Sequence, residues 1–142
     1  PVGSLVVGNQ EFIGSAREWR KIMGGTLRQS GIIAAPGIIA LEKMIDRLKE
    51  DHDNARRLAD GLVEIKGFRL DMRTVQTNIV KLDVSGLGCD IGRFSAELKK
   101  QGVEISVLGG SSVRMVTHRG IESSDIDIAL NIIETTAERL RT

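Results

Sequence analysis

Three basic residues stand in sequence contexts that suit the binding of an anion. Arg28 lies in a turn rich in glycine, threonine and serine, and Lys21 comes just before the double glycine that opens this turn. Arg114 lies inside the apolar run 113–116, where a charge is costly unless it meets a partner. A guanidinium is a planar fork of donors that matches a carboxylate or a phosphate. The three residues therefore predict a site for an anionic small molecule.

Each of these contexts also has a purely structural interpretation. Lys21 and the glycines after it are typical of a helix C-terminus, where basic side chains complement the helix dipole and glycine ends the helix. Arg114 fits the exposed face of an edge strand equally well. His52 suits a structural role at the edge of an apolar helix stripe, and the segment around His118 is typical of a plain turn. Cys89 stands in a glycine-rich loop without an obvious His or Asp partner, so we do not expect it to be a nucleophile.

Known motifs for nucleotides and metals are missing from the sequence. It contains no Walker A motif, no G-x-G-x-x-G and no H-E-x-x-H. No second His or Cys stands at ligand spacing from His52. We therefore expect no metal site, and the sequence supplies pieces for anion binding without a reaction centre of its own.

Composition narrows the class of protein. The formal net charge is +1, from 20 basic and 19 acidic side chains, so no strong positive field favours nucleic acid. The longest apolar run, around residues 31–40, contains Pro and Gly and is too short to cross a bilayer. A single cysteine cannot form an internal disulfide, which favours the cytoplasm. We expect a soluble cytoplasmic protein that binds neither nucleic acid nor membrane.

The spacing of apolar residues predicts the secondary structure. Periods near 3.6 indicate helices and alternation indicates strands. Helices are predicted at 9–23, 41–65, 90–101 and 123–140, and strands at 5–7, 68–72, 79–84, 103–107 and 113–116. Pro36 stands where a further helix can start, Asn9 and Asp90 are the predicted helix caps, and Ser123 or Ser124 is expected to cap the last helix.

This order of elements predicts that the last part of the chain is an α+β layer. From the helix 41–65 onward the predicted order is α-β-β-α-β-β-α, which suits helices on one face of a mainly antiparallel sheet. Residues 1–35 are predicted to be the end of a larger domain, and residues 36–142 a small C-terminal domain that includes the connecting helix. The strand predicted directly after Pro1-Val2-Gly3-Ser4 is what we expect of a chain that begins inside a fold.

Four separated motifs resemble those of the low-specificity L-threonine aldolases. They are Pro1-Val2-Gly3-Ser4, the run from Trp19-Arg20-Lys21 through Gly24-Gly25 to Arg28-Gln29-Ser30-Gly31, Glu50-Asp51-His52-Asp53-Asn54-Ala55, and Val113-Arg114-Met115-Val116-Thr117-His118. The resemblance extends over essentially all 142 residues, in order and nearly without gaps.

The resemblance implies an α/β pyridoxal-phosphate (PLP) enzyme of fold type I, the fold of aspartate aminotransferase. It also implies that residues 1–35 are the end of the large PLP-binding domain. Members cleave L-threonine and L-allo-threonine to glycine and acetaldehyde by a retro-aldol reaction. By resemblance, Arg114 binds the substrate carboxylate, and Arg28 reaches the cofactor phosphate of a neighbouring subunit. Lys21 matches a basic residue near the active site, which makes it a candidate catalytic residue.

The resemblance further implies that the Schiff-base lysine lies in a Ser-Lys-Gly run just upstream of Pro1. The 142-residue chain alone is therefore expected to be inactive, and its expected partners are the missing N-terminal half and further copies in a homodimer or homotetramer. The alternative is a freestanding, non-catalytic binding or interaction domain derived from the same fold. A sister lyase or transaminase on this fold is a third hypothesis.

Overall fold

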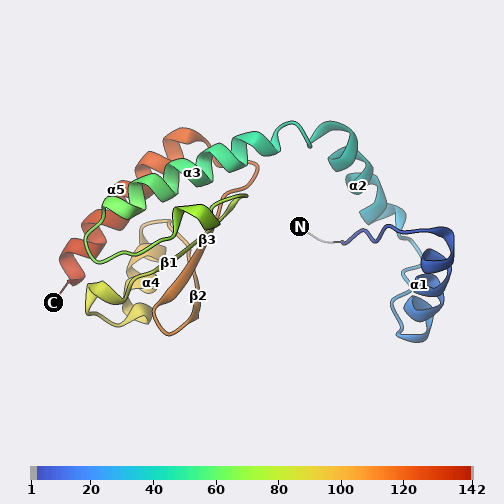
Figure 1. The fold of residues 1–142 in the computed structure, drawn as a ribbon, viewed down its shortest axis with the longest axis horizontal. Helices are drawn as coiled ribbons and strands as arrows, with labels where there is room; N and C mark the ends of the chain where they lie inside the picture. The colour runs from blue at the N-terminus through green and yellow to red at the C-terminus, as the bar shows by residue number, and fades with distance from the viewer. Residues whose placement is uncertain (1–2, 142) are drawn as a thin grey trace. The chain divides into compact units, whose positions relative to one another are not determined.

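The computed structural model describes residues 3–141 and divides the chain into two compact units. Unit 1 is Pro1–Asp46 and unit 2 is Arg47–Thr142 (Figure 1). The predicted boundary between residues 35 and 36 falls inside a helix of unit 1, so the structure divides the chain further along than the sequence suggested. Pro1 and Val2 of the opening motif lie outside the described residues.

Unit 1 contains two helices joined by the glycine turn. Helix α1 is Gln10–Ile22, and the Asn9 side chain caps it by accepting a hydrogen bond from the Phe12 amide at 2.8 Å. The turn follows, with Gly24 in the left-handed region at φ 72°, which a residue with a Cβ adopts less readily. Helix α2 is Gly31–Lys43. The cap, the helix and the turn were all predicted from the sequence.

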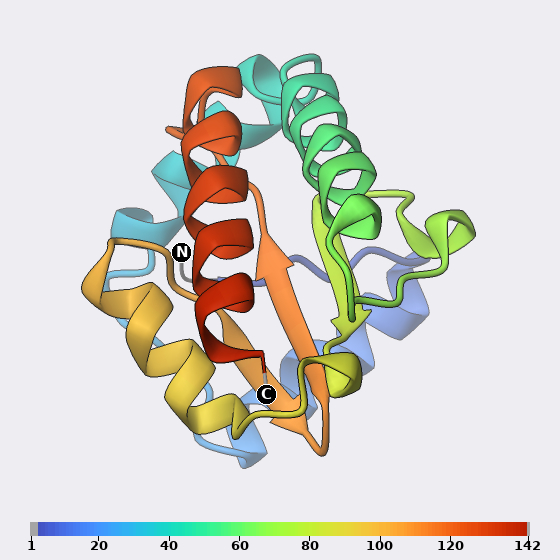
Figure 2. The ribbon, with the colours of Figure 1, turned by 90° about the vertical axis from the view of Figure 1, so that its left-hand side faces the viewer.

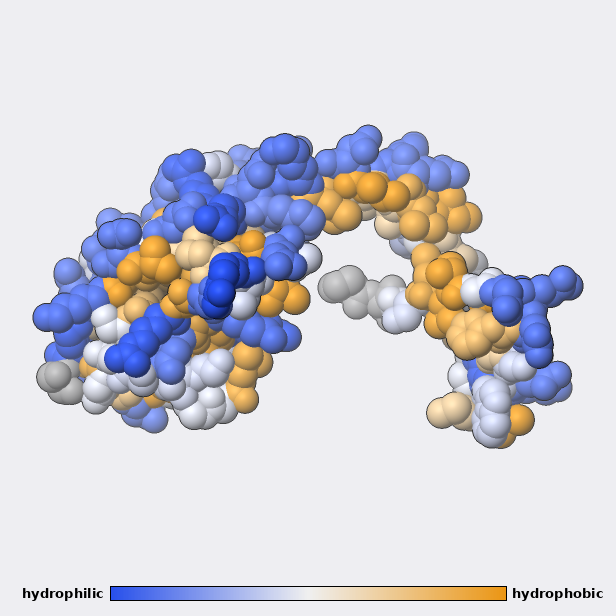
Figure 3. Space-filling model, in the orientation of Figure 1, coloured by the Kyte–Doolittle hydropathy of each residue, from blue (hydrophilic) through white to orange (hydrophobic). Residues whose placement is uncertain are grey.

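Neither helix of unit 1 has a buried residue. Large apolar side chains of unit 1 are exposed, among them Trp19 at 61% and Ile32 at 76%, and apolar surface along α2 is visible in Figure 3. The predicted buried strand at 5–7 is wrong: these residues form no strand, and Val7 is 88% exposed. A strand needs a partner for its main-chain groups, and within unit 1 the described residues supply none.

The long helix predicted at 41–65 is two helices. Helix α2 ends at Lys43, and α3 spans Leu48–Glu64. Between them Arg47 turns back onto the first turn of α3 and donates to both carboxylate oxygens of Asp51, at 3.1 and 3.0 Å. The prediction that a helix starts at Pro36 is also wrong, because Pro36 lies inside α2. Apolar spacing continues across the break and so could not reveal it.

Unit 2 is built on a three-stranded antiparallel sheet. The strands are β1 (Ile79–Asp83), β2 (Ser106–Gly109) and β3 (Ser112–Val116), in the order β1-β3-β2. The helices α3, α4 (Ile91–Lys100) and α5 (Ser123–Leu140) lie on one face of this sheet (Figure 2). Among the described residues of unit 2, no helix covers the other face, which we call the open face.

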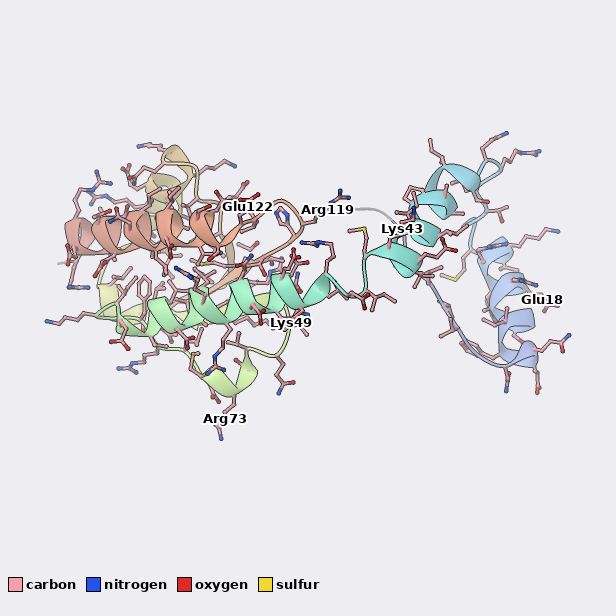
Figure 4. All side chains as sticks on the ribbon, turned by 90° about the horizontal axis from the view of Figure 1, so that it is seen from above. Glu18, Lys43, Lys49, Arg73, Arg119 and Glu122 are labelled. Carbon is pink, nitrogen blue, oxygen red and sulfur yellow. The ribbon has the colours of Figure 1, made fainter. Side chains whose placement is uncertain are left out.

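The core of unit 2 lies between the helices and the sheet. Phe94 of α4 is fully buried, and its ring meets Phe68 edge-on with 6.0 Å between centroids. Val113 and Met115 of β3 pack into the same cluster. The charged side of α3 is solvated, as predicted, and Lys49 projects from it (Figure 4) while pairing with Asp53. Among the described residues, no helix is long and apolar enough to span a membrane.

Three details of unit 2 differ from the prediction. The strand at 68–72 is only an isolated bridge between Arg69 and Asp83, followed by a 3₁₀ turn at Met72–Thr74. The α-β-β-α-β-β-α order therefore becomes α3-β1-α4-β2-β3-α5. Strand β2 begins at Ser106 rather than at 103, and Glu122 caps α5 in a capping box with Asp125. The antiparallel α+β layer itself is confirmed.

Candidate functional site

The sheet places Arg114 at the centre of the open face. Along β3, Val113 and Met115 are buried while the flanking Ser112, Arg114 and Val116 are more exposed, so alternation turns Arg114 away from the helices. Strand β3 lies between β1 and β2, which rules out the edge-strand interpretation of Arg114. A charged residue on a central strand needs a specific partner more than one at an edge does.

The guanidinium of Arg114 is poorly satisfied within unit 2. Its Nε is buried and has no hydrogen-bond partner in the part of the chain that the structure describes. Its Nη2 donates only to Ser106 Oγ, over a long 3.5 Å. Buried donors in folded proteins are nearly always paired. The arrangement therefore leaves hydrogen-bonding capacity for an acceptor that the described chain does not supply.

Strand register surrounds Arg114 with one cation and one hydroxyl. Lys81 of β1 is its direct partner on one side, and Ser106 of β2 is its partner on the other. The three strands carry one acidic residue, Asp83. Ser85 donates to Asp83, through its amide at 2.6 Å, and these hydrogen bonds hold the pKa of Asp83 below its ordinary value. The row of Lys81, Arg114 and Ser106 is thus positively charged.

A buried polar network fixes β3 against α3. Thr117, 2% exposed, donates its hydroxyl to the Asp51 carbonyl at 2.6 Å. The Asn78 side chain donates to the Thr117 carbonyl at 2.7 Å, and the Thr117 amide donates to the Asn78 carbonyl at 3.0 Å. The Asn54 side chain donates to the Ile121 carbonyl at 2.9 Å. These bonds hold the strand end three residues from Arg114.

The other two predicted site residues belong to unit 1. Lys21 lies in the last turn of α1 and Arg28 in the turn before α2. Both are exposed, and neither side chain has a hydrogen bond or ion pair to another described residue. Lys21 therefore comes just before the glycine turn of unit 1 and Arg28 lies within it, whereas Arg114 belongs to unit 2.

The two histidines that the sequence singled out have no partner set for catalysis among the described residues. His52 is exposed on α3. His118 is exposed as well, and its Nδ1 lies 2.8 Å from the carbonyl of Arg119. Within the Glu50–Ala55 motif, the side chains of Asp51 and Asn54 form hydrogen bonds that stabilise the fold.

The guanidinium groups of Arg114 and Arg28 each suit an anionic ligand. Arg114 offers a fork of N–H donors to a carboxylate, and Arg28 offers one to a phosphate. These are the two kinds of anion that an amino-acid substrate and a PLP cofactor carry. The unpaired Nε of Arg114 is the observation that supports this fit. When bound, PLP supplies an electron sink for cleavage next to an amino-acid α-carbon.

Solved structures of PLP enzymes have the same fold. Glutamate decarboxylase of Lactobacillus brevis CGMCC 1306 matches 66% of this chain and 24% of its own, with a TM-score of 0.57 and 16% identity. The structure of MppP soaked with the product 2-ketoarginine matches 70% of this chain and 30% of its own, with a TM-score of 0.55 and 13% identity. The fold is that of PLP-dependent enzymes of fold type I, as predicted.

The chain belongs to the beta-eliminating lyase family, whose model matches residues 1–85. Its sequence is 36% identical over 139 residues to low-specificity L-threonine aldolase 1 of Arabidopsis thaliana, covering 94% of this chain and 38% of that protein. It is 37% identical over 131 residues to the low specificity L-threonine aldolase of Escherichia coli K12, covering 89% of this chain and 36% of that protein. The resemblance to the threonine aldolases is confirmed, and the chain spans a little over a third of the length of these relatives.

Sequence reasoning missed Lys81 and Ser106. The alternation at 79–84 was recognised, and it already sets Lys81 apart from the buried Val80 and Leu82. What the sequence did not contain is the register that places Lys81 opposite Arg114, since pairing partners far apart in sequence are decided by the tertiary fold.

Proposed function

We propose that this chain is part of a PLP-dependent threonine aldolase, which cleaves L-threonine and L-allo-threonine to glycine and acetaldehyde. The single observation that carries the proposal is Arg114, whose buried Nε has no partner among the described residues and which stands on the central strand of the open face, in a chain 35–37% identical to proteins named as threonine aldolases. The substrate class is a small amino acid.

In this proposal Arg114 binds the substrate carboxylate. Two parallel N–H···O bonds fix both the position and the rotation of a carboxylate. Fixing that group helps to orient the bond between Cα and Cβ for cleavage, and such orientation lowers the barrier by removing freedom before the reaction. Ser106 Oγ accepts a long hydrogen bond from Nη2 of Arg114, which leaves the other N–H groups of the guanidinium for the carboxylate.

Arg28 is proposed to bind the cofactor phosphate of a neighbouring subunit, and Lys21 to act near the reacting atoms as a catalytic candidate. Both side chains are exposed within unit 1, and the apolar side chains around them suit a surface that other polypeptide covers. We further propose a homodimeric or homotetrameric assembly in the cytoplasm. The lysine that binds PLP is proposed to lie in polypeptide that precedes Pro1, in the part of the relatives that this chain does not span.

Arg114→Ala in the complete protein tests the proposal. Losing a charge-assisted, two-bond contact is expected to lower kcat/KM for L-threonine by about 2–4 kcal/mol of transition-state stabilisation, while the cofactor stays bound. The assay measures acetaldehyde release together with the visible absorbance of bound PLP. Arg93→Ala is the matched control, because Arg93 is an exposed arginine on α4 whose side chain contacts no partner among the described residues.

Unchanged kinetics in Arg114→Ala would place Arg114 outside the substrate site. The alternative, a non-catalytic binding domain, predicts no acetaldehyde from the complete wild-type protein under any cofactor concentration. Acetaldehyde release that depends on added PLP excludes this alternative.

A further inference from the structure

The cross-strand pair of Lys81 and Arg114 is unfavourable in the protein as it stands. The two residues are direct partners in the antiparallel pairing of β1 and β3, and side chains of such partners on one face lie about 5 Å apart at Cβ. Like charges placed this way repel and destabilise the pair. A bound anion between or above them turns this repulsion into attraction.

No carboxylate of the strands relieves this repulsion. Asp83 is the acidic residue of the three strands, and it is engaged by Ser85. The Lys81 side chain has no hydrogen bond or ion pair to any other residue that the structure describes. Arg69, next to β1, interacts electrostatically with Asp83. Among the described residues, neither Lys81 nor Arg114 therefore forms a direct ion pair with a carboxylate.

There is also room for a ligand beside Lys81. A hollow of about 510 Å³ lies against β1, and Lys81 is among the residues that line it. Two carboxylates also line it, Asp71 and Asp83, and each already accepts hydrogen bonds, from Arg73 and from Ser85. Lys81 is exposed, so a small molecule held at Arg114 can approach its ammonium from solvent. A lysine ammonium acts as a point charge on a flexible stem and needs no fixed geometry to attract an anion.

We propose that Lys81 is a second cation of the substrate site, which strengthens the binding of the carboxylate that Arg114 orients. The inference rests on the proposed function, because it assigns a further residue to the same site. Arg114 supplies direction through its two N–H bonds, whereas Lys81 supplies charge. Lys81 thus acts on substrate affinity and leaves the chemical step almost unchanged.

The test is Lys81→Met in the complete protein, since methionine keeps a long unbranched side chain and removes the charge. A unit charge about 6 Å away in a water-like to partly shielded medium corresponds to a three- to tenfold change in binding. We therefore expect KM for L-threonine to rise about three- to tenfold, with kcat within about twofold of the wild type. The inhibition constant of acetate, a simple carboxylate probe, should rise by a similar factor.

Three comparisons make the result specific. Lys66→Met removes one exposed lysine elsewhere in unit 2 and is expected to leave KM unchanged, which controls for net charge. Lys81→Arg is expected to retain a KM near the wild-type value. In about 0.5 M salt the effect of Lys81→Met should shrink, because screening shortens the reach of an exposed charge to about 4–5 Å.

A KM in Lys81→Met equal to that in Lys66→Met overturns the inference, as does an increase that Lys81→Arg fails to prevent. The failure of the proposed function looks different. If Arg114→Ala itself leaves KM and kcat unchanged, the substrate site has been misplaced. If Arg114→Ala raises KM and Lys81→Met does not, only the role of Lys81 is wrong.

Discussion

Thr117→Val tests whether the buried hydrogen bonds between β3 and α3 stabilise the strand that carries Arg114. The substitution keeps the shape of the side chain and removes its hydroxyl. In the wild type this hydroxyl donates to the Asp51 carbonyl at 2.6 Å, and Thr117 is buried. A net hydrogen bond contributes about 0.5–1.5 kcal/mol, and a buried acceptor that loses a partner adds to the loss. We expect the free energy of unfolding to fall by about 1–2 kcal/mol.

The assay is thermal denaturation followed by circular dichroism. For a domain of this size, each 1 kcal/mol corresponds to about 4–8 °C in Tm, so Thr117→Val is expected to lower Tm by about 5–15 °C. Thr135→Val is the matched control, because Thr135 makes the same type of bond, to the Asn131 carbonyl at 2.7 Å, at an exposed position on α5. Equal melting of the two variants would refute the reasoning, since it would show that the buried hydroxyl contributes no more than the exposed one.

Two further predictions concern pH and assembly. Hydrogen bonding from Lys100, supported by Arg139, lowers the pKa of Glu97. The contribution of Glu97 to stability is therefore present above about pH 4.5 and is lost as pH falls through the lowered pKa. Glu97→Gln should flatten the loss of Tm below about pH 4.5, and an unchanged pH profile would contradict this. If Arg28 binds the phosphate of a neighbouring subunit, mixing inactive Arg28→Ala subunits with subunits that lack the PLP-binding lysine should restore part of the activity. No recovery, in conditions where wild-type subunits exchange and stay active, would place Arg28 in its own subunit's site.

The parts of the fold that the sequence predicted are those set by local signals. Asn9 and Asp90 cap their helices as expected, because a capping side chain bonds to amides two or three residues away. The alternation of apolar and polar residues predicted β1 and β3, because it too is a local signal. The fully buried Val80 and Val113 stand among more exposed neighbours.

The parts that the sequence missed depend on partners far away in the chain. Residues 68–72 alternate like a strand, yet only Arg69 forms a bridge, to Asp83. The apolar run at 5–7 has no partner strand among the residues of unit 1 that the structure describes. Alternation states that a segment can pair, whereas pairing itself is decided by the tertiary fold.

The motifs of the resemblance turned out to contain two kinds of residue. Asp51 and Asn54 stand in a motif that identifies the family, and the structure assigns their side chains to Arg47 and to the Ile121 carbonyl. Thr117 of the last motif bonds the Asp51 carbonyl. Two of the four motifs thus connect α3 to the end of β3, and within them Arg114 has a buried donor without a partner among the described residues. Resemblance alone could not separate these roles, but burial and hydrogen-bond partners do.

The family model and the threonine aldolase relatives match different lengths of this chain. The family model covers residues 1–85 and so includes Lys81 but stops before Arg114, whereas the threonine aldolases match through most of the chain. Register joins the two parts, because Lys81 and Arg114 are cross-strand partners. An anion bound at Arg114 would therefore lie next to the side chain of Lys81. If Arg114 binds the substrate carboxylate as proposed, a change of charge at position 81 alters substrate affinity without alteration of the arginine itself.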